Sequence, residues 1–150
     1  MRVEKRLIRE KIAEVASRRH KLIIICSNGN QAKIQDLISR IEAPQINLSL
    51  HLSKELLEVP IGRRPLVVSG KVQDLVNTYQ EEFICLYNIE LLFHPDLKIN
   101  PLQLLENISR YKGLVVAWNG QYKDGILTYG ILGHPEYQAY DEVNAELLSL

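Results

Sequence analysis

The chain has 150 residues, of which 46% are hydrophobic and 24% charged, and its formal net charge is zero. This composition is typical of one globular domain with a hydrophobic core and excludes a disordered chain. The longest apolar runs, such as residues 22–26, are too short to cross a bilayer. The start of the chain is charged where a signal peptide would be apolar. We therefore expect a single cytoplasmic domain over residues 1–150.

Cys26 and Cys85 both lie inside apolar runs that resemble strands. This position favours buried, reduced thiols over a disulfide or a metal framework. The four histidines have no spacing typical of metal ligands, so we predict no metal site.

The charges are unevenly distributed. Residues 1–21 contain eight Lys or Arg and three Glu, whereas residues 134–150 contain four acidic residues and no Lys or Arg. A solvated helix face explains such asymmetry, and so does contact with a protein or a nucleic acid. No recognition-helix or aromatic stacking motif is present, so any DNA contact would be non-specific. It would use Arg2, Lys5, Arg6, Arg9, Arg18 and Arg19.

The first third of the chain alternates between helical and strand patterns. An apolar stripe at steps of three and four predicts a basic amphipathic helix over residues 1–20. Residues 22–26 predict a strand buried on both faces. A second helix follows and is broken at Pro44. Residues 46–50 predict a strand, and the next helix is expected to be capped by Ser53 and ended by Pro60.

The alternation continues to the end of the chain. Residues 61–69 have little regular pattern and predict a connector, followed by a helix over 69–82. Residues 83–86 and 114–118 predict two further buried strands, with a helix that starts near Pro101 between them. The pairs Asn119-Gly120 and Asp124-Gly125 predict turns, with strands between residues 126 and 132. We expect the tail, residues 141–150, to be a short helix or frayed.

Strands that alternate with helices predict an α/β fold with a mostly parallel sheet and helices on both faces. In such sheets ligands bind beyond the carboxyl ends of the strands. Three segments follow predicted strand ends, namely residues 27–33, 87–90 and 119–120.

The segment after the first strand has the outline of a phosphate-binding loop. Against the pattern G-x-x-x-x-G-K-[ST], it keeps only the lysine, Lys33. The remaining candidate nucleotide-binding residues of this loop are Ser27, Asn28, Gly29, Asn30, Gln31, Ala32 and Ile34. The residues from Asn28 to Asn30 tolerate left-handed conformations. The loop could therefore form a nest of N–H groups that binds an anion, or an ordinary turn between a strand and a helix. Ile34 stands where a hydroxyl would bind magnesium.

The segment after the second buried strand is also altered. A nucleotide hydrolase of this type ends that strand with Asp, often followed by Glu, to bind the metal and polarise water. Here the pair is Tyr87-Asn88. The nearest carboxylate, Glu90, lies about 6–7 Å further along an extended chain. Glu90 is the candidate catalytic residue, with capping or salt bridging as its alternative role.

Six segments resemble one protein family in their order and in their amino-acid sequence: INLSL (46–50), LSKELLEVP (52–60), NIELLFHPDLKINPLQLLENISR (88–110), VVAWNG (115–120), LTYG (127–130) and GHPEYQAY (133–140). Over about residues 21–140 the chain resembles BrxF, the small P-loop-containing subunits of type 3 bacteriophage exclusion (BREX) systems. The resemblance implies a P-loop NTPase-like core and a role in bacterial antiviral defence, in which host DNA is marked by methylation and unmarked phage DNA fails to replicate. It implies the larger ATPase, methyltransferase and phosphatase-like BREX subunits as partners.

This chain departs from the family at the magnesium-binding positions. Typical members carry a complete phosphate loop and an Asp at the position of Tyr87. Lys33, Asn88 and Glu90 remain here, whereas Ile34 and Tyr87 replace the metal ligands. Asn119 follows the third strand, where related ATPase folds place a polar phosphate sensor, although a turn with Gly120 is an equal explanation.

Three functional hypotheses follow. The first is a non-catalytic or weakly nucleotide-binding BREX subunit that acts through protein contacts, with self-assembly left open. ATP would then bind weakly, and Mg²⁺ is not expected. The second is a working ATPase or nucleotide-gated switch that uses Lys33, Glu90 and water. The third is a DNA-binding accessory protein that uses the basic N-terminal helix.

Overall fold

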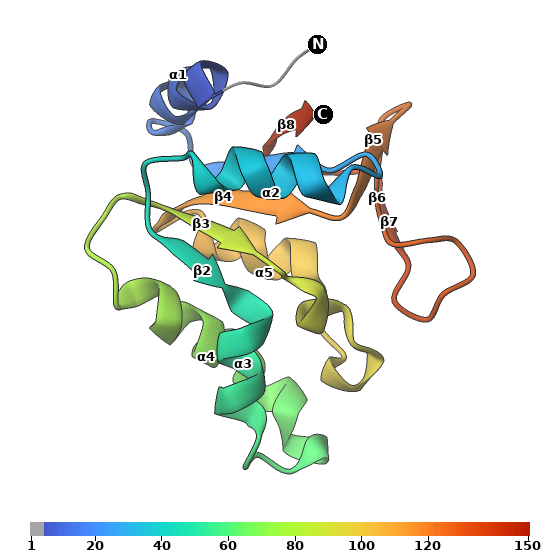
Figure 1. The fold of residues 1–150 in the computed structure, drawn as a ribbon. Coiled ribbons are helices and arrows are strands. Elements are labelled where there is room, and N and C mark those ends of the chain that lie inside the picture. The colour runs from blue at the N-terminus through green and yellow to red at the C-terminus, as the bar shows by residue number, and fades with distance from the viewer. Residues whose placement is uncertain (1–4) are drawn as a thin grey trace.

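The computed structural model describes residues 5–150 and has an α/β architecture (Figure 1). Five strands form an all-parallel sheet in the order β2-β3-β4-β1-β8. Their bounds are β1 Leu22–Cys26, β2 Gln45–Asn47, β3 Phe83–Tyr87, β4 Gly113–Trp118 and β8 Glu146–Ser149. The predicted α/β class with a parallel sheet is therefore confirmed, and so are the three buried strands.

Helices cover both faces of this sheet (Figure 1). α1 (Lys5–Val15) and α2 (Gln31–Ser39) pack on one face, and α3 (Leu48–Leu56), α4 (Arg64–Asn77) and α5 (Pro101–Ile108) on the other. In β1, Ile23 and Ile25 face α1 and α2, whereas Leu22, Ile24 and Cys26 face the opposite layer. Because both faces are covered, all five β1 residues are buried, as the continuous apolar run predicts.

The cysteines lie in these two cores, as expected. Cys26 and Cys85 are buried and free, and burial raises the pKa of each thiol to about 12. Within residues 5–150, no helix is both long enough and apolar enough to traverse a bilayer.

A second, antiparallel sheet is built from β5 (Gly120–Lys123), β6 (Ile126–Tyr129) and β7 (Gln138–Tyr140). The predicted turn at Asp124-Gly125 is confirmed, since both residues have positive φ (54° and 79°), as a type I′ hairpin requires. The predicted strand over 126–132 is too long, because Gly130 has a φ of 76° and ends it. Gly120 begins β5 instead of completing a turn with Asn119.

The predicted strand over residues 46–50 is wrong after Asn47. The Asn47 Oδ1 atom accepts a hydrogen bond from the Leu50 N–H at 3.2 Å and caps α3, which begins at Leu48. Ser53 is therefore not the cap: it lies inside the helix, and its hydroxyl donates to the Leu50 carbonyl. An Asn cap ends the strand earlier than the apolar pattern suggests.

The predicted connector over residues 61–69 is also wrong. A 3₁₀ turn, η1 (Ile61–Arg63), leads into α4, whose first turn accommodates a proline. The buried residues Val68, Val72 and Val76 recur every four positions and fix this helix on the core. α4 spans Arg64–Asn77, so the helix begins and ends earlier in the chain than the prediction of residues 69–82.

The tail is neither a helix nor frayed. β8 pairs with β1 in parallel, and Leu148 is buried against the α1 and α2 face. The Leu150 N–H donates to the Cys26 carbonyl at 3.2 Å, beside the loop that follows β1. A strand that depends on a partner far away in the sequence leaves little local signal.

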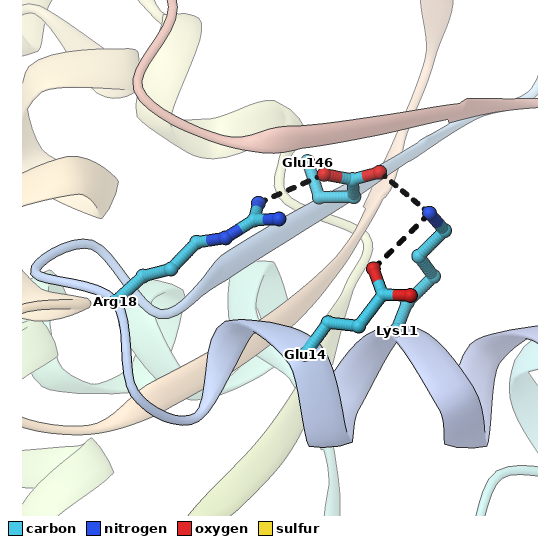
Figure 2. A network of polar contacts seen from close by, with 4 residues as sticks. All are labelled: Lys11, Glu14, Arg18 and Glu146. Atoms are coloured by element: carbon cyan, nitrogen blue, oxygen red, sulfur yellow. Dashed lines mark hydrogen bonds and ion pairs between the residues drawn. The ribbon is translucent and has the colours of Figure 1, made fainter.

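An ion-pair network joins this strand to the basic helix (Figure 2). The Glu146 carboxylate contacts Arg18 at 2.9 Å and Lys11 at 3.0 Å, and Lys11 also contacts Glu14 at 3.3 Å. Hydrogen bonds from Arg18 and Lys11 lower the pKa of Glu146, and the bond to Glu146 is the main cause that raises the pKa of Lys11. The basic and acidic ends of the chain are thus partly neutralised by each other.

We predict that Glu146→Gln lowers the free energy of unfolding by about 1–2 kcal/mol near neutral pH, because it removes two charge-assisted contacts. The folded-state pKa is depressed below 4.5, so the stabilisation is full above that value and is lost as the pH falls through the folded pKa. Urea unfolding of both proteins between neutral and acidic pH measures this. Glu142→Gln, the same change at an exposed neighbour, should have little effect. A Glu146→Gln deficit that persists unchanged in acid would contradict the prediction.

Candidate functional site

A cleft of about 370 Å³ lies at the carboxyl ends of the parallel strands. It is lined by one face of α2, by residues 87–90 at the end of β3 and just after it, and by Ala117, Trp118 and Asn119 at the end of β4. β4 lies between β1 and β3 in the sheet, so the segments that follow these three strands meet. The cleft therefore occupies the position where open α/β sheets bind ligands.

The loop after β1 is a tight turn. Asn28 and Gly29 have positive φ values of 51° and 81°, and the Asn30 N–H donates to the Ser27 carbonyl at 2.9 Å. These are the features of a type I′ turn. The Ser27 and Asn28 N–H groups donate to the carbonyls of Trp118 and Gly120. Three backbone donors of this loop, the N–H groups of Ser27, Asn28 and Asn30, are therefore used within the protein.

The helix that follows begins at Gln31 because Asn30 caps it. The Asn30 Oδ1 atom accepts the Lys33 N–H at 3.1 Å, and the Asn30 carbonyl accepts the Ile34 N–H at 3.2 Å. In this part of the chain, the amides of Gly29, Gln31 and Ala32 have no hydrogen-bond partner among the described residues. Gln31 and Ala32 are ordinary open donors of a first helical turn.

Lys33 does not reach the cleft. The cleft-lining residues Gln31, Gln35 and Ile38 mark one face of α2. At 3.6 residues per turn, Lys33 lies about 200° around the helix from Gln31, on the opposite side. Lys33 is exposed, as is Ala32. The one residue of the phosphate-loop pattern that the chain retains is thus turned away from the other candidates.

Asn119 is held among polar neighbours at the end of β4. Its Oδ1 atom accepts hydrogen bonds from the Gln31 side-chain amide and, at 3.5 Å, from the buried Ser27 hydroxyl. Three of the candidate binding residues are therefore brought together. Asn119 also precedes Gly120, the first residue of β5, so its position is fixed by both sheets.

Glu90 lies at the rim of the cleft, at the start of the 3₁₀ turn η2 (Glu90–Phe93). The Ser49 hydroxyl donates to Glu90 Oε2 at 3.1 Å and accepts the Leu91 N–H at 3.1 Å. The Ser49 N–H donates to the Asn88 carbonyl at 2.8 Å. Ser49 thus fixes the whole 88–91 segment. The apolar pattern of the sequence does not select Ser49, because it places this residue inside the predicted strand over residues 46–50.

Two of the cleft-lining residues, Trp118 and Tyr129, belong to an aromatic cluster. The Phe93 and Tyr129 rings stack at 3.5 Å, and Trp118 packs edge-on against both, with centroids at 5.4 and 5.5 Å. The Trp118 Nε1–H donates to the Thr128 carbonyl at 2.8 Å and so joins the two sheets. Burial, with smaller contributions from the Glu90 and Glu136 charges, raises the pKa of Tyr129, so this phenol stays neutral near neutral pH. Tyr129 was not among the predicted site residues.

These residues do not fit a magnesium–triphosphate complex. Ile34 is 3% exposed and offers no metal ligand, and Tyr87 offers a phenol and no carboxylate. Among the residues that the structure describes, no Lys, Arg or His lines the cleft. Over residues 5–150, no group of three His, Cys, Asp or Glu side chains is placed to hold a metal ion.

Cations in α1 and just after it are paired within the protein. The described helix ends at Val15, earlier than the helix predicted over residues 1–20, so Arg18 follows it. Arg6 pairs with Glu10 at 3.4 Å, Arg9 with Glu42 at 3.3 Å, and Arg18 with Glu146 at 2.9 Å. Arg2 lies outside the described residues. Intramolecular pairs of this kind compete with the phosphate contacts that non-specific DNA binding requires.

No protein-family model matches this chain, and comparisons with curated proteins and with solved structures found no match. The assignment of a function therefore depends on the residues and on the geometry of the cleft.

Proposed function

We propose that this chain is a P-loop NTPase-like accessory subunit of a type 3 BREX anti-phage system that has lost nucleotide hydrolysis and acts through contacts with the other subunits. The single observation that carries the loss of hydrolysis is the state of the loop after β1. It is closed by a type I′ turn and an Asn30 cap, and Lys33 lies on the far side of α2 from the cleft.

The arrangement of the cleft supports the P-loop-like part of the proposal. The loop, the Asn119 position and the 87–90 segment follow three adjacent strands, with the Asn119 strand in the middle. The BrxF resemblance implies the phosphate loop and the acidic residue at the first and last of these positions, and related ATPase folds place a polar sensor at the middle one. In this proposal, the arrangement is kept while the ligand-binding side chains are replaced.

The proposal is tested by calorimetry and by genetics. Titration with ATP and Mg²⁺ should give no saturable heat at micromolar concentrations and no phosphate release. Deleting the gene should make the host sensitive to phage, and a Lys33→Ala variant should restore protection fully, because the lysine contacts no ligand. Micromolar binding with turnover, or a Lys33→Ala variant that fails to protect although it is folded, would favour the active ATPase. A salt-sensitive gel shift with DNA would favour the DNA-binding alternative.

A further inference from the structure

We propose that the cleft binds the guanidinium group of an arginine side chain presented by a partner protein. The inference deepens the proposed function, because it names the chemistry by which a protein contact is made. It depends on the proposed function only for the statement that the partner is a protein.

The charge of the cleft indicates that its ligand is a cation. Within the described part of the chain, Glu90 is the only charged residue that lines it. Ser49 holds Glu90 Oε2, whereas Oε1 accepts no hydrogen bond from any described residue. A carboxylate held in place with one oxygen available is suited to a cation. The same charge repels phosphate, which has no positively charged side chain to meet it here.

The neutral groups select a guanidinium over a simple ammonium. The Gln31 amide donates through Nε2 to Asn119, and the Gln45 amide donates through Nε2 to the Ile38 carbonyl, which leaves both Oε1 atoms as acceptors. Tyr87 adds a half-buried aromatic ring to the wall. A planar guanidinium has five donors in a fixed arrangement and stacks on aromatic faces, whereas an ammonium is a compact point charge.

The size and the surroundings of the cleft favour a side chain from a protein. Its volume of about 370 Å³ is near the lower limit for ligand sites and suits one long side chain. Immediately after the cleft-lining Tyr129, the loop that joins β6 to β7 exposes Ile131 and Leu132 to 69% and 79%. Two adjacent exposed large apolar side chains give a folded partner a surface to cover.

The test uses the fluorescence of Trp118, which is the only tryptophan and lines the cleft. Blocked glycyl-arginyl-glycine should give a saturable change with a Kd of about 1–10 mM. Glu90→Gln should weaken it about tenfold or more, because the carboxylate contact is lost. The matched control, Glu58→Gln, removes an exposed carboxylate outside the cleft and should bind like the wild type. The lysine tripeptide should bind more weakly than the arginine one.

Three outcomes would overturn the inference. They are the absence of any saturable response to the arginine peptide, equal binding by Glu90→Gln, and tighter binding of agmatine than of the peptide, which would assign the cleft to a small molecule. Each of them leaves the calorimetric result with ATP untouched. Binding of inorganic triphosphate in the same assay would instead contradict the loss of phosphate binding on which the proposed function depends.

Discussion

Gly120→Ala is expected to lower the free energy of unfolding by about 3 kcal/mol or more. A Cβ atom at this position would lie 1.8 Å from the Thr128 carbonyl oxygen and 2.8 Å from its carbon, and these backbone atoms have little freedom to move. The same oxygen accepts the Trp118 indole N–H, so relief of the clash breaks that bond as well. Equilibrium unfolding in urea measures the loss.

Gly62→Ala provides the matched control. A Cβ atom at Gly62 would meet nothing within 4 Å, and this glycine lies in the 3₁₀ turn η1 without a positive φ. The change should therefore be neutral or slightly stabilising, within about 0.5 kcal/mol. Equal stabilities of the two variants would show that β5 and β6 do not approach each other as closely as described.

Trp118→Ala is expected to cost about 3–5 kcal/mol. The side chain is fully buried and packs edge-on against Phe93, Tyr129 and Tyr140. It also joins β4 to β6 through the Thr128 carbonyl. The loss combines a large cavity with the loss of the hydrogen bond to the Thr128 carbonyl. Unfolding followed by far-ultraviolet circular dichroism measures it without needing tryptophan fluorescence.

Tyr122→Ala is the control for this second change. Tyr122 belongs to the same antiparallel sheet but is 42% exposed, so its removal should cost less than about 1 kcal/mol. A Trp118→Ala variant as stable as Tyr122→Ala would contradict the role of the aromatic cluster as the junction of the two sheets.

The sequence predicts the parallel sheet well, because a strand that is buried on both faces is a continuous run of apolar residues. β1, β3 and β4 are continuous apolar runs, and their alternate residues enter two different cores. Elements with weak local patterns are missed. β8 is held by pairing with β1 and by the Glu146 contacts to Lys11 and Arg18, all more than a hundred residues away in the sequence.

Capping explains most of the remaining differences. Asn47 begins α3 earlier than the apolar pattern suggests, and Asn30 sets the start of α2 at Gln31, directly after the predicted turn. For the candidate site the second case matters more. Starting α2 at Gln31 determines which residues face the cleft, so it turns Gln31 and Gln35 inward and Lys33 outward. The sequence identified the three strand ends that form the cleft, but the direction of one side chain depends on where a helix begins.

The most direct test of the account is an amide NMR titration of the wild type and of the Ile34→Thr, Tyr87→Asp double variant with ATP and Mg²⁺. The account predicts no saturable shifts for the amides of residues 27–34 in either protein. The turn and the cap use the N–H groups of Ser27, Asn28, Asn30, Lys33 and Ile34, the cleft has no cation to hold a phosphate, and Lys33 is on the wrong face of α2. Metal-dependent shifts of Gly29 to Lys33 in the wild type would contradict it. The same shifts in the double variant alone would show that only the metal ligands are missing and that the loop still opens.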